Sequence, residues 1–315
     1  MEGIMRHARL KPDYQDTWHH CYNRAAGTRD DRPFDDTEKE VFVRILKRLA
    51  AFYAVRVVSY TFMSNHFHII LQAPAEVPSE EETAARYTAF HKGKREIHPG
   101  TEVCAEWAIR LRDVSWFMSH FQHLCTAWYN RTRPVRRRGP LWAGRFKNTV
   151  LEPGRALWAC WAYVECNPVR AKIVADPADY RFCSYGEWAQ TGRHPFADAV
   201  ARFLAPALPT PFAAANAADA LDTLKARFAR EDAEEAAQKA ISGIPRPCEF
   251  LLTTRRRVRH WADGLVIGSE LFVREVIRCA RPSIAKPSHR LAKAEPVSDA
   301  PDVITCWRRL RPALE

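Results

Sequence analysis

The 315-residue sequence lacks long apolar runs. Its longest apolar run without a charge, residues 156–164, is about half of what a membrane-spanning helix needs. The first residues, MEGIMRHARLKPDY, contain no apolar core of the signal-peptide type. These two absences exclude a secreted or membrane-spanning class, and the sequence predicts a cytoplasmic protein without a membrane partner.

Cysteine pairs at metal-binding spacing are also missing. The nine cysteines are an odd number, they are scattered, and no Cys-x-x-Cys occurs. This pattern excludes a thiolate zinc site and a disulfide framework. We expect reduced thiols that pack as small apolar groups.

Acidic residues are fewer than basic ones, 37 against 48, which gives a net charge of +11. Such an excess favours a polyanionic partner. Residues 131–147 (RTRPVRRRGPLWAGRFK) hold seven Arg or Lys and no acid, and residues 255–259 (RRRVR) form a second cluster. Either cluster can be a solvated face, but Trp142 and Phe146 in the first suit a surface that neutralises phosphates and stacks bases.

Two histidines one residue apart stand in an apolar run, residues 60–72 (YTFMSNHFHIILQ). In a strand, His66 and His68 lie on one face and Phe67 on the other. Two neutral imidazoles at this spacing can share one divalent cation. The alternative is a pair that is hydrogen-bonded or faces solvent.

Hydrophobic periodicity predicts an alternation of strands and helices, with Asp36 or Thr37 as the cap of the first helix. Residues 76–106 change to a polar composition and are expected to be an inserted helix and a mobile connection over the sheet. The expected strands are 17–24, 54–62, 66–72 and 145–151, and the expected helices are 36–49, 83–90, 114–131 and 155–166. The short link Met63-Ser64-Asn65, with Ser64 and Asn65 as turn residues, predicts that the strands at 54–62 and 66–72 form an antiparallel hairpin.

The helix expected at 155–166 brings a tyrosine and an amide together. Tyr163 and Asn167 fall on one flank of its apolar stripe, four residues apart. Asn167 precedes Pro168, so it is expected to close the helix. Taken singly, Tyr163 can be a packing residue and Asn167 a turn residue.

Three segments together carry a family resemblance. MSNHFHIILQAP, WYNRTRPVRRRGPLWAGRFK and YVECNPVRAKIVADPADYRFCSYGEW, in this order and spacing, resemble the REP-associated tyrosine transposases, relatives of the insertion-sequence-200-like HUH single-tyrosine transposases. The resemblance covers Tyr14 to Trp188. It implies that His66 and His68 are the metal motif, that Tyr163 is the nucleophile and that Asn167 is the third ligand, with Tyr129 as a rival nucleophile.

The resemblance also implies a fold and a chemistry. The fold is α+β, a ferredoxin-like antiparallel sheet with helices on one face, plus a helical C-terminal extension. The cofactor is Mg²⁺ or Mn²⁺, and the partner is single-stranded hairpin DNA, which is cleaved and rejoined through a 5′-phosphotyrosine. Such a protein is a monomer or homodimer and is nucleoid-associated when bound to DNA. The lack of a Gly-rich Walker loop and of a dense Asp/Asp/Glu set agrees with this chemistry.

Basic residues of the second and third segments, with Arg24, are the expected DNA contacts. Trp142 and Phe146 can instead pack the segment 131–147, which we call the basic loop, against the rest of the domain. Arg170 can instead form a structural salt bridge. The candidate DNA-binding residues are Arg24, Arg133, Arg136, Arg137, Arg138, Trp142, Arg145, Lys147 and Arg170.

The expected domains are a catalytic domain at 1–195, a linker and charged helix at 196–247, and a small helical accessory region at 248–315. The charged helix is expected at 219–240. The accessory region is a DNA-binding module or a packing appendage. Within it, residues 261–269 are expected to form a turn, and Ser269 is expected to cap the helix at 270–279. Two other functions stay open. One is a domesticated protein that binds hairpin DNA or RNA without cutting it, and the other is a hydrolase that uses His66 and His68 on a small substrate.

Overall fold

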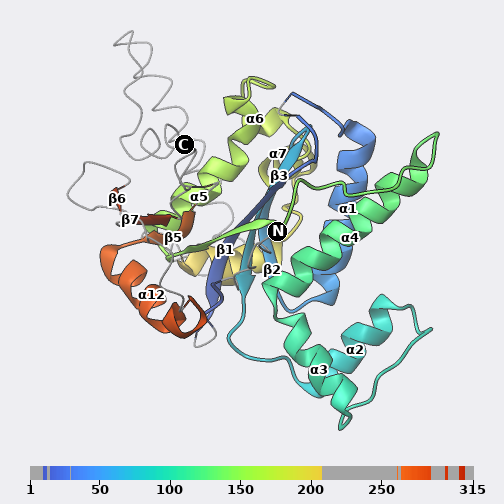
Figure 1. Ribbon diagram of the computed structural model, residues 1–315, viewed down its shortest axis with the longest axis vertical. Coiled ribbons are helices and arrows are strands. Elements are labelled where there is room, and N and C mark those ends of the chain that lie inside the picture. The colour runs from blue at the N-terminus through green and yellow to red at the C-terminus, as the bar shows by residue number, and fades with distance from the viewer. Residues whose placement is uncertain are drawn as a thin grey trace, which may run out of the picture. The chain divides into compact units, whose positions relative to one another are not determined.

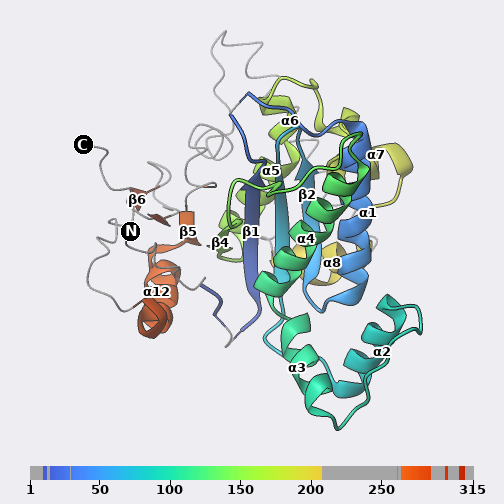
Figure 2. The ribbon, with the colours of Figure 1, turned by 45° about the vertical axis from the view of Figure 1, so that its right-hand side comes forward.

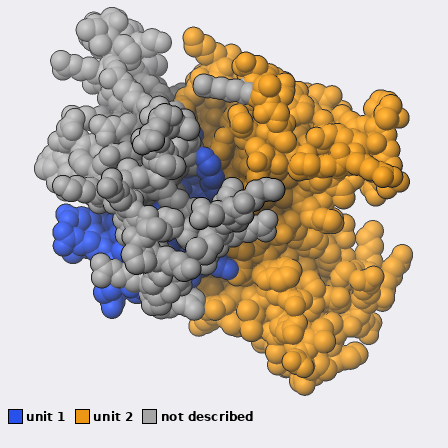
Figure 3. All heavy atoms as spheres, in the orientation of Figure 1, with its two compact units in different colours: residues 1–20, 147–163, 201–315 blue, residues 21–146, 164–200 orange. Residues whose placement is uncertain are grey.

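The computed structural model describes residues 10–12, 15–28, 30–207, 261, 264–284, 295–296 and 305–308. The chain divides into two compact units (Figure 3), and both are discontinuous in sequence. Unit 1 consists of residues 1–20, 147–163 and 201–315, and unit 2 of residues 21–146 and 164–200. The two units are described separately below.

Unit 2 is built on a β-hairpin. Strand β2 (Arg56–Phe62) pairs antiparallel with β3 (His66–Ala73), with Phe62 opposite Phe67. The second half of β1 (Thr17–Arg24) follows β3 in the strand order. The three-residue link between β2 and β3 confirms the hairpin that the sequence predicts.

Helices α1 (Asp36–Phe52) and α4 (Val114–Thr132) cover one face of this hairpin (Figures 1 and 2). The Phe62 ring lies 5.9 Å from the Phe121 ring, and the Phe67 ring lies 5.5 Å from it. The cap of helix α1 is Asp35, one residue before the predicted Asp36, because Asp35 accepts hydrogen bonds from the first turn and Glu38 completes a capping box.

The inserted segment is a pair of helices, α2 (Glu80–Phe90) and α3 (Glu102–Leu111). The sequence predicts only the first of them, and α3 starts where Thr101 accepts a hydrogen bond from the Cys104 amide. The Phe90 ring stacks on Phe52 of α1 at 4.2 Å. The pair therefore packs on the end of α1 rather than over the sheet, contrary to the expectation (Figure 2).

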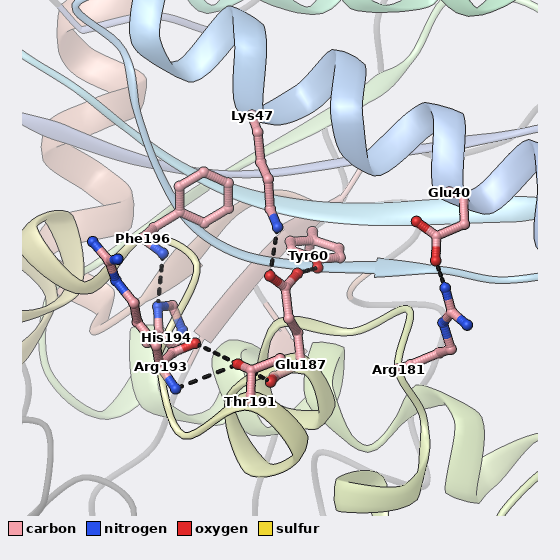
Figure 4. A network of polar contacts seen from close by, with 9 residues as sticks. All are labelled: Glu40, Lys47, Tyr60, Arg181, Glu187, Thr191, Arg193, His194 and Phe196. Atoms are coloured by element: carbon pink, nitrogen blue, oxygen red, sulfur yellow. Dashed lines mark hydrogen bonds and ion pairs between the residues drawn. The ribbon is translucent and has the colours of Figure 1, made fainter.

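A segment leading into α7 (Ser184–Thr191) covers the edge strand β2. The Phe62 amide donates to the Phe182 carbonyl at 2.9 Å, and the Tyr60 amide donates to Ser184 Oγ at 3.2 Å. On α7, Glu187 accepts hydrogen bonds from Tyr60 and from Lys47 of α1 (Figure 4). This arrangement protects an edge that would otherwise expose unpaired backbone groups. The other short helices are α6 (Asn167–Arg170), η1 (Pro177–Asp179), α8 (Ala197–Ala199), η2 (Val200–Leu204) and η3 (Ala205–Ala207).

Unit 1 contains strands that lie far apart in the sequence. β4 (Lys147–Leu151) pairs parallel with β5 (Gly264–Gly268), β5 pairs antiparallel with β7 (Thr305–Arg308), and β7 pairs with β6 (Glu295–Pro296). Helix α12 (Glu270–Ile284) packs Val273 and Val276 against β4 and β5. Ser269 accepts a hydrogen bond from the Phe272 amide, which confirms the predicted cap.

The C-terminal part thus differs from the helical extension that we expected, because residues 264–268 form a strand rather than a turn. The α+β class is confirmed. The predicted helix at 219–240 and the basic cluster at 255–259 lie outside the described residues, as does most of the predicted linker. Within the described ranges, no helix is both long and apolar enough to cross a bilayer.

Candidate functional site

Strand β3 presents its two histidines on one face of the unit 2 hairpin. The His66 and His68 ring centroids lie 5.2 Å apart, and the rings are perpendicular, at 89°. Tyr22 of β1 packs against both, with ring centroids 4.9 Å from His68 and 5.8 Å from His66. Phe67 points away into the α1–α4 core, where its ring lies 5.1 Å from Trp142. The alternation of β3 therefore separates a polar face from an apolar one.

His66 is held in its neutral form. Burial lowers its pKa to about 4; a hydrogen bond with Asn167 opposes the shift, and the charges of Arg170, Arg32 and Arg24 add to it. Its Nδ1 lies 2.7 Å from Asn65 Oδ1, which can only accept, so Nδ1 carries the proton. The other nitrogen, Nε2, then has a free lone pair, which is the form that binds a metal.

Contacts from β2 place Asn167 beside these histidines. Thr61, directly opposite His68 in the hairpin, donates a hydrogen bond to the Val164 carbonyl at 2.6 Å. Ser59, two residues earlier and on the same face, donates to Glu165 at 2.7 Å. The end of α5 (Arg155–Glu165) is thus fixed to the strand that pairs with β3.

Glu165 ties this junction to α7 as well. Its carboxylate is fully buried and accepts hydrogen bonds from Ser184 Oγ and, at 3.0 Å, from the Tyr185 amide. Burial raises the pKa of Glu165 to about 7 in spite of these donors. The segment between α5 and α6 is therefore held at a fixed place on the polar face of β2 and β3.

Asn167 does not close α5 as predicted but starts the short helix α6. Pro168 then occupies the first turn of α6, where a missing amide hydrogen costs nothing. The Asn167 side chain is 7% exposed, and its Nδ2 has no hydrogen-bond partner among the described residues. A buried amide nitrogen without a partner indicates a position that can bind a ligand.

The donor set fits a divalent cation only in part. Two imidazoles and one amide can supply three ligands, and water or phosphate oxygens would have to complete the shell. Across the described ranges, no group of three or more His, Cys, Asp and Glu side chains is placed to hold a metal. A cation here would therefore take its remaining ligands from water or from a bound phosphate.

Three guanidinium groups act on His66 through their charges. Arg24, Arg32 and Arg170 all lie close enough for their charges to lower its pKa. Arg24 and Arg170 are sequence-predicted DNA contacts, whereas Arg32 is not. A cluster of guanidinium groups beside two neutral imidazoles favours an anion with several oxygens, such as a phosphodiester.

The basic loop is pinned to the end of β1, next to Arg24. The Ala143 amide donates to the Arg24 carbonyl at 2.9 Å, and the Ala26 amide donates to the Leu141 carbonyl at 2.8 Å. Asn23 Nδ2 donates to the Gly144 carbonyl at 2.9 Å. These bonds place the loop after α4 beside Arg24, one of the three arginines whose charges lower the pKa of His66.

The predicted basic contacts divide into two groups. Arg133 forms an ion pair with Glu38, and Arg137 donates hydrogen bonds to Asn130 Oδ1 and the Pro140 carbonyl, so both organise the loop. The side chains of the second group are exposed on the surface. This group consists of Arg136, Arg138 and Arg145 in unit 2 and Lys147 in unit 1.

Trp142 and Phe146 are buried rather than displayed. Trp142 is 8% exposed, its ring lies 5.5 Å from Phe34, and its Nε1 donates to the Gln122 carbonyl at 3.2 Å. Phe146 is 5% exposed. Both fill the packing role that the sequence left open, and stacking of a base on Trp142 stays a prediction.

Tyr163 belongs to unit 1, whereas His66, His68 and Asn167 belong to unit 2. Its ring is 4% exposed and stacks on Trp261 at 5.5 Å. His20 meets the Tyr163 ring edge-on at 6.0 Å. The convergence of Tyr163 with the histidine pair stays a prediction.

His20 is a neutral imidazole beside this tyrosine. Its Nδ1 donates to the Trp261 carbonyl at 3.1 Å, and burial lowers its pKa to about 4. The rival tyrosine, Tyr129, lies under the Arg133 guanidinium at 4.2 Å and helps to order the basic loop.

Sequence reasoning missed Tyr22, Arg32 and His20. Tyr22 and His20 lie in the strand that was predicted at 17–24, and its run of His and Tyr residues in an otherwise apolar segment was the available signal. Arg32 follows in a polar turn and carries no local signal.

Comparison with solved structures gives a distant likeness. No family model matches the chain, and no curated protein does. Among solved structures, the chain is similar to a REP-associated tyrosine transposase bound to a REP hairpin, with a TM-score of 0.34 and 13% identity, over 61% of this chain and 87% of that one. At these values the likeness by itself assigns no function.

Proposed function

We propose that the chain binds hairpin-forming single-stranded DNA and cleaves and rejoins it through a 5′-phosphotyrosine. The observation that supports this proposal best is the grouping of His66, His68 and the Asn167 amide beside Arg24, Arg32 and Arg170. In this proposal the fold is a ferredoxin-like HUH fold.

In the proposed mechanism, the three guanidinium groups and the basic loop hold the scissile phosphodiester against the histidine face. Asn65 keeps His66 in the tautomer whose Nε2 can act as a ligand. His66, His68 and the Asn167 amide oxygen would hold Mg²⁺ or Mn²⁺, which would supply a positive charge that offsets the negative charge developing on the phosphate oxygens in the transition state.

Tyr163 is the proposed nucleophile. Its phenolic oxygen forms a bond to phosphorus while the bond from phosphorus to the 3′-oxygen breaks, and the phenolic proton ends on the released 3′-hydroxyl. The phosphotyrosine retains the energy of the broken ester. A free 3′-hydroxyl can therefore reverse the step and rejoin DNA without a nucleotide cofactor.

A hairpin-binding protein that does not cut DNA is the second candidate. The burial of Tyr163 under Trp261 favours it, because a nucleophile has to reach its phosphate. In that case the basic loop and the guanidinium cluster alone carry the function.

A nicking assay tests the proposal. Labelled single-stranded oligonucleotides with an imperfect hairpin are incubated with the protein and Mn²⁺ or Mg²⁺, beside scrambled oligonucleotides of equal length. We expect nicks at one position of the hairpin substrate, which are lost with a chelator. Binding without any nick under both metals would leave the non-catalytic candidate.

A further inference from the structure

One end of α4 carries an exposed aromatic ring next to cations, away from the residues assigned to the site above. Trp116 is 48% exposed, and the Arg110 guanidinium lies 4.9 Å from its ring. Arg110 also contacts the Trp107 ring at 5.3 Å and forms an ion pair with Glu106 at 2.8 Å. The guanidinium is therefore held in place by α3, the helix that the insertion adds.

Two histidines and a further arginine continue this surface along α4 and α1. His120 and His123 follow Trp116 at the spacing that places all three on one stripe of the helix. The His120 ring lies 5.6 Å from Phe90, and the exposed Arg48 guanidinium lies 4.3 Å from the same ring. We call Trp116, Arg110, His120, His123 and Arg48 the Trp116 surface.

The stripe leads to the basic loop. From His123 it continues through the exposed Ala127 to the exposed Arg131 at the end of α4, where the loop begins. At the rise of an α-helix, Trp116 and Arg131 are about 22 Å apart. A strand of nucleic acid held by the loop can follow this face of α4 to Trp116.

We propose that the Trp116 surface binds unpaired nucleic acid that flanks the hairpin. Trp116 stacks an unpaired base, while Arg48 and Arg110 contact phosphates of the same strand. An exposed indole among cations suits a single strand, because every base offers a face for stacking and the backbone is anionic. The inference that the ligand is the flank of a hairpin rests on the proposed function. The inference that the Trp116 surface binds a single strand does not.

Fluorescence anisotropy separates the two contacts. The probes are a bare hairpin, the same hairpin with single-stranded flanks of about ten nucleotides on both sides, and an unstructured oligonucleotide of the same length as the flanks. We expect the flanked hairpin to bind more tightly than the bare one. Trp116→Ala should weaken binding of the flanked hairpin about tenfold and leave the affinity for the bare hairpin unchanged. Trp116→Phe should restore most of the lost affinity.

Salt dependence tests the phosphate contacts. The double variant Arg48→Gln, Arg110→Gln should lower the slope of log affinity against log salt by about 1.4 for the flanked hairpin. The matched control, Arg274→Gln with Arg278→Gln on α12, removes the same charge from exposed arginines that are not part of the Trp116 surface and should leave the slope unchanged.

Three results overturn the inference. They are equal affinity of the wild type for flanked and bare hairpins, equal loss of both in Trp116→Ala, and a change of oligomeric state in that variant without a change in DNA binding, which would assign the surface to a second copy. If no hairpin binds but Trp116→Ala still weakens binding of the unstructured oligonucleotide, the proposed function fails and the inference stands.

Discussion

At the scale of single residues, the chemistry of the candidate site depends on the neutrality of His66. A protonated imidazole has no lone pair for a metal, and the three guanidinium groups nearby disfavour a further positive charge. The same groups favour a phosphate. The charges near the histidine face thus favour binding of an anion, and the neutral histidines can bind a cation beside it.

His66→Ala and His68→Ala should each abolish cleavage of a hairpin substrate. Each removes one of the few ligands available to the cation, whereas affinity for the hairpin should stay within about threefold because phosphate contacts dominate binding. Nicking and anisotropy assays on the same preparations measure the two effects. Equal loss of binding and cleavage would mean that the pair is structural.

His194 should make stability depend on pH. It is buried, its Nδ1 accepts a hydrogen bond from the Phe196 amide, and burial lowers its pKa from 6.5 to about 3 (Figure 4). Because the unfolded chain binds the proton first, stability falls as the pH drops below 6.5. This group should cost the folded state about 2 kcal/mol on going from about pH 7 to about pH 5.

Urea unfolding of His194→Asn checks this expectation. Asparagine can accept the same hydrogen bond but does not titrate, so the variant should lose about 2 kcal/mol less than the wild type over that range. His98→Asn, at an exposed histidine, is the control and should follow the wild type. Parallel curves for all three proteins would contradict the assignment.

Local alternation was sufficient to predict that His66 and His68 share a face. It was not sufficient for Tyr22 and Arg32, because their proximity depends on the order of strands β2, β3 and β1, which is a long-range property. Asn65 was predicted as a turn residue, and only the structure adds its contact with His66.

At the scale of elements, the basic loop is anchored where α4 ends against the start of α1. Arg133, just after α4, pairs with Glu38, whose carboxylate also completes the cap of α1. One buried carboxylate thus fixes both the helix start and the loop. The exposed Arg136 and Arg138 therefore lie on a loop whose first residues are held in place.

Glu38→Gln should therefore lower the free energy of unfolding by about 1–3 kcal/mol, since it weakens a cap and leaves a partly buried guanidinium without its counter-charge. Glu40→Gln, two residues further along α1, is the matched control. Glu40 pairs with Arg181 but its side chain is 42% exposed, against 3% for Glu38, so the loss should stay within about 0.5 kcal/mol. Equal losses in chemical denaturation would refute the anchoring role.

The elements that sequence reasoning missed have two physical causes. Helix α3 is short and follows Pro99 and Gly100, so its buried positions, Cys104, Ala108 and Leu111, form too brief a pattern to stand out. Strand β5 is a five-residue apolar run whose partner, β4, lies more than a hundred residues earlier. A short apolar run acquires its strand conformation from such a partner, and this information is not local.

At the scale of the whole molecule, the division into two units passes between Tyr163 and Val164, inside α5. Tyr163 and the proposed ligand Asn167 are thus four residues apart in sequence and are assigned to different units. The resemblance seen in the sequence predicts that they act on one phosphate. That meeting is the central claim of the proposed mechanism.

Trapping of a covalent protein–DNA adduct tests this claim most directly. A labelled hairpin substrate is incubated with Mn²⁺, the reaction is stopped under denaturing conditions, and the modified peptide is identified by mass spectrometry. We predict an adduct on Tyr163 that is lost in Tyr163→Phe and in His66→Ala but persists in Tyr129→Phe and Tyr22→Phe. An adduct on another tyrosine, or cleavage by the wild type without any adduct, would contradict the account.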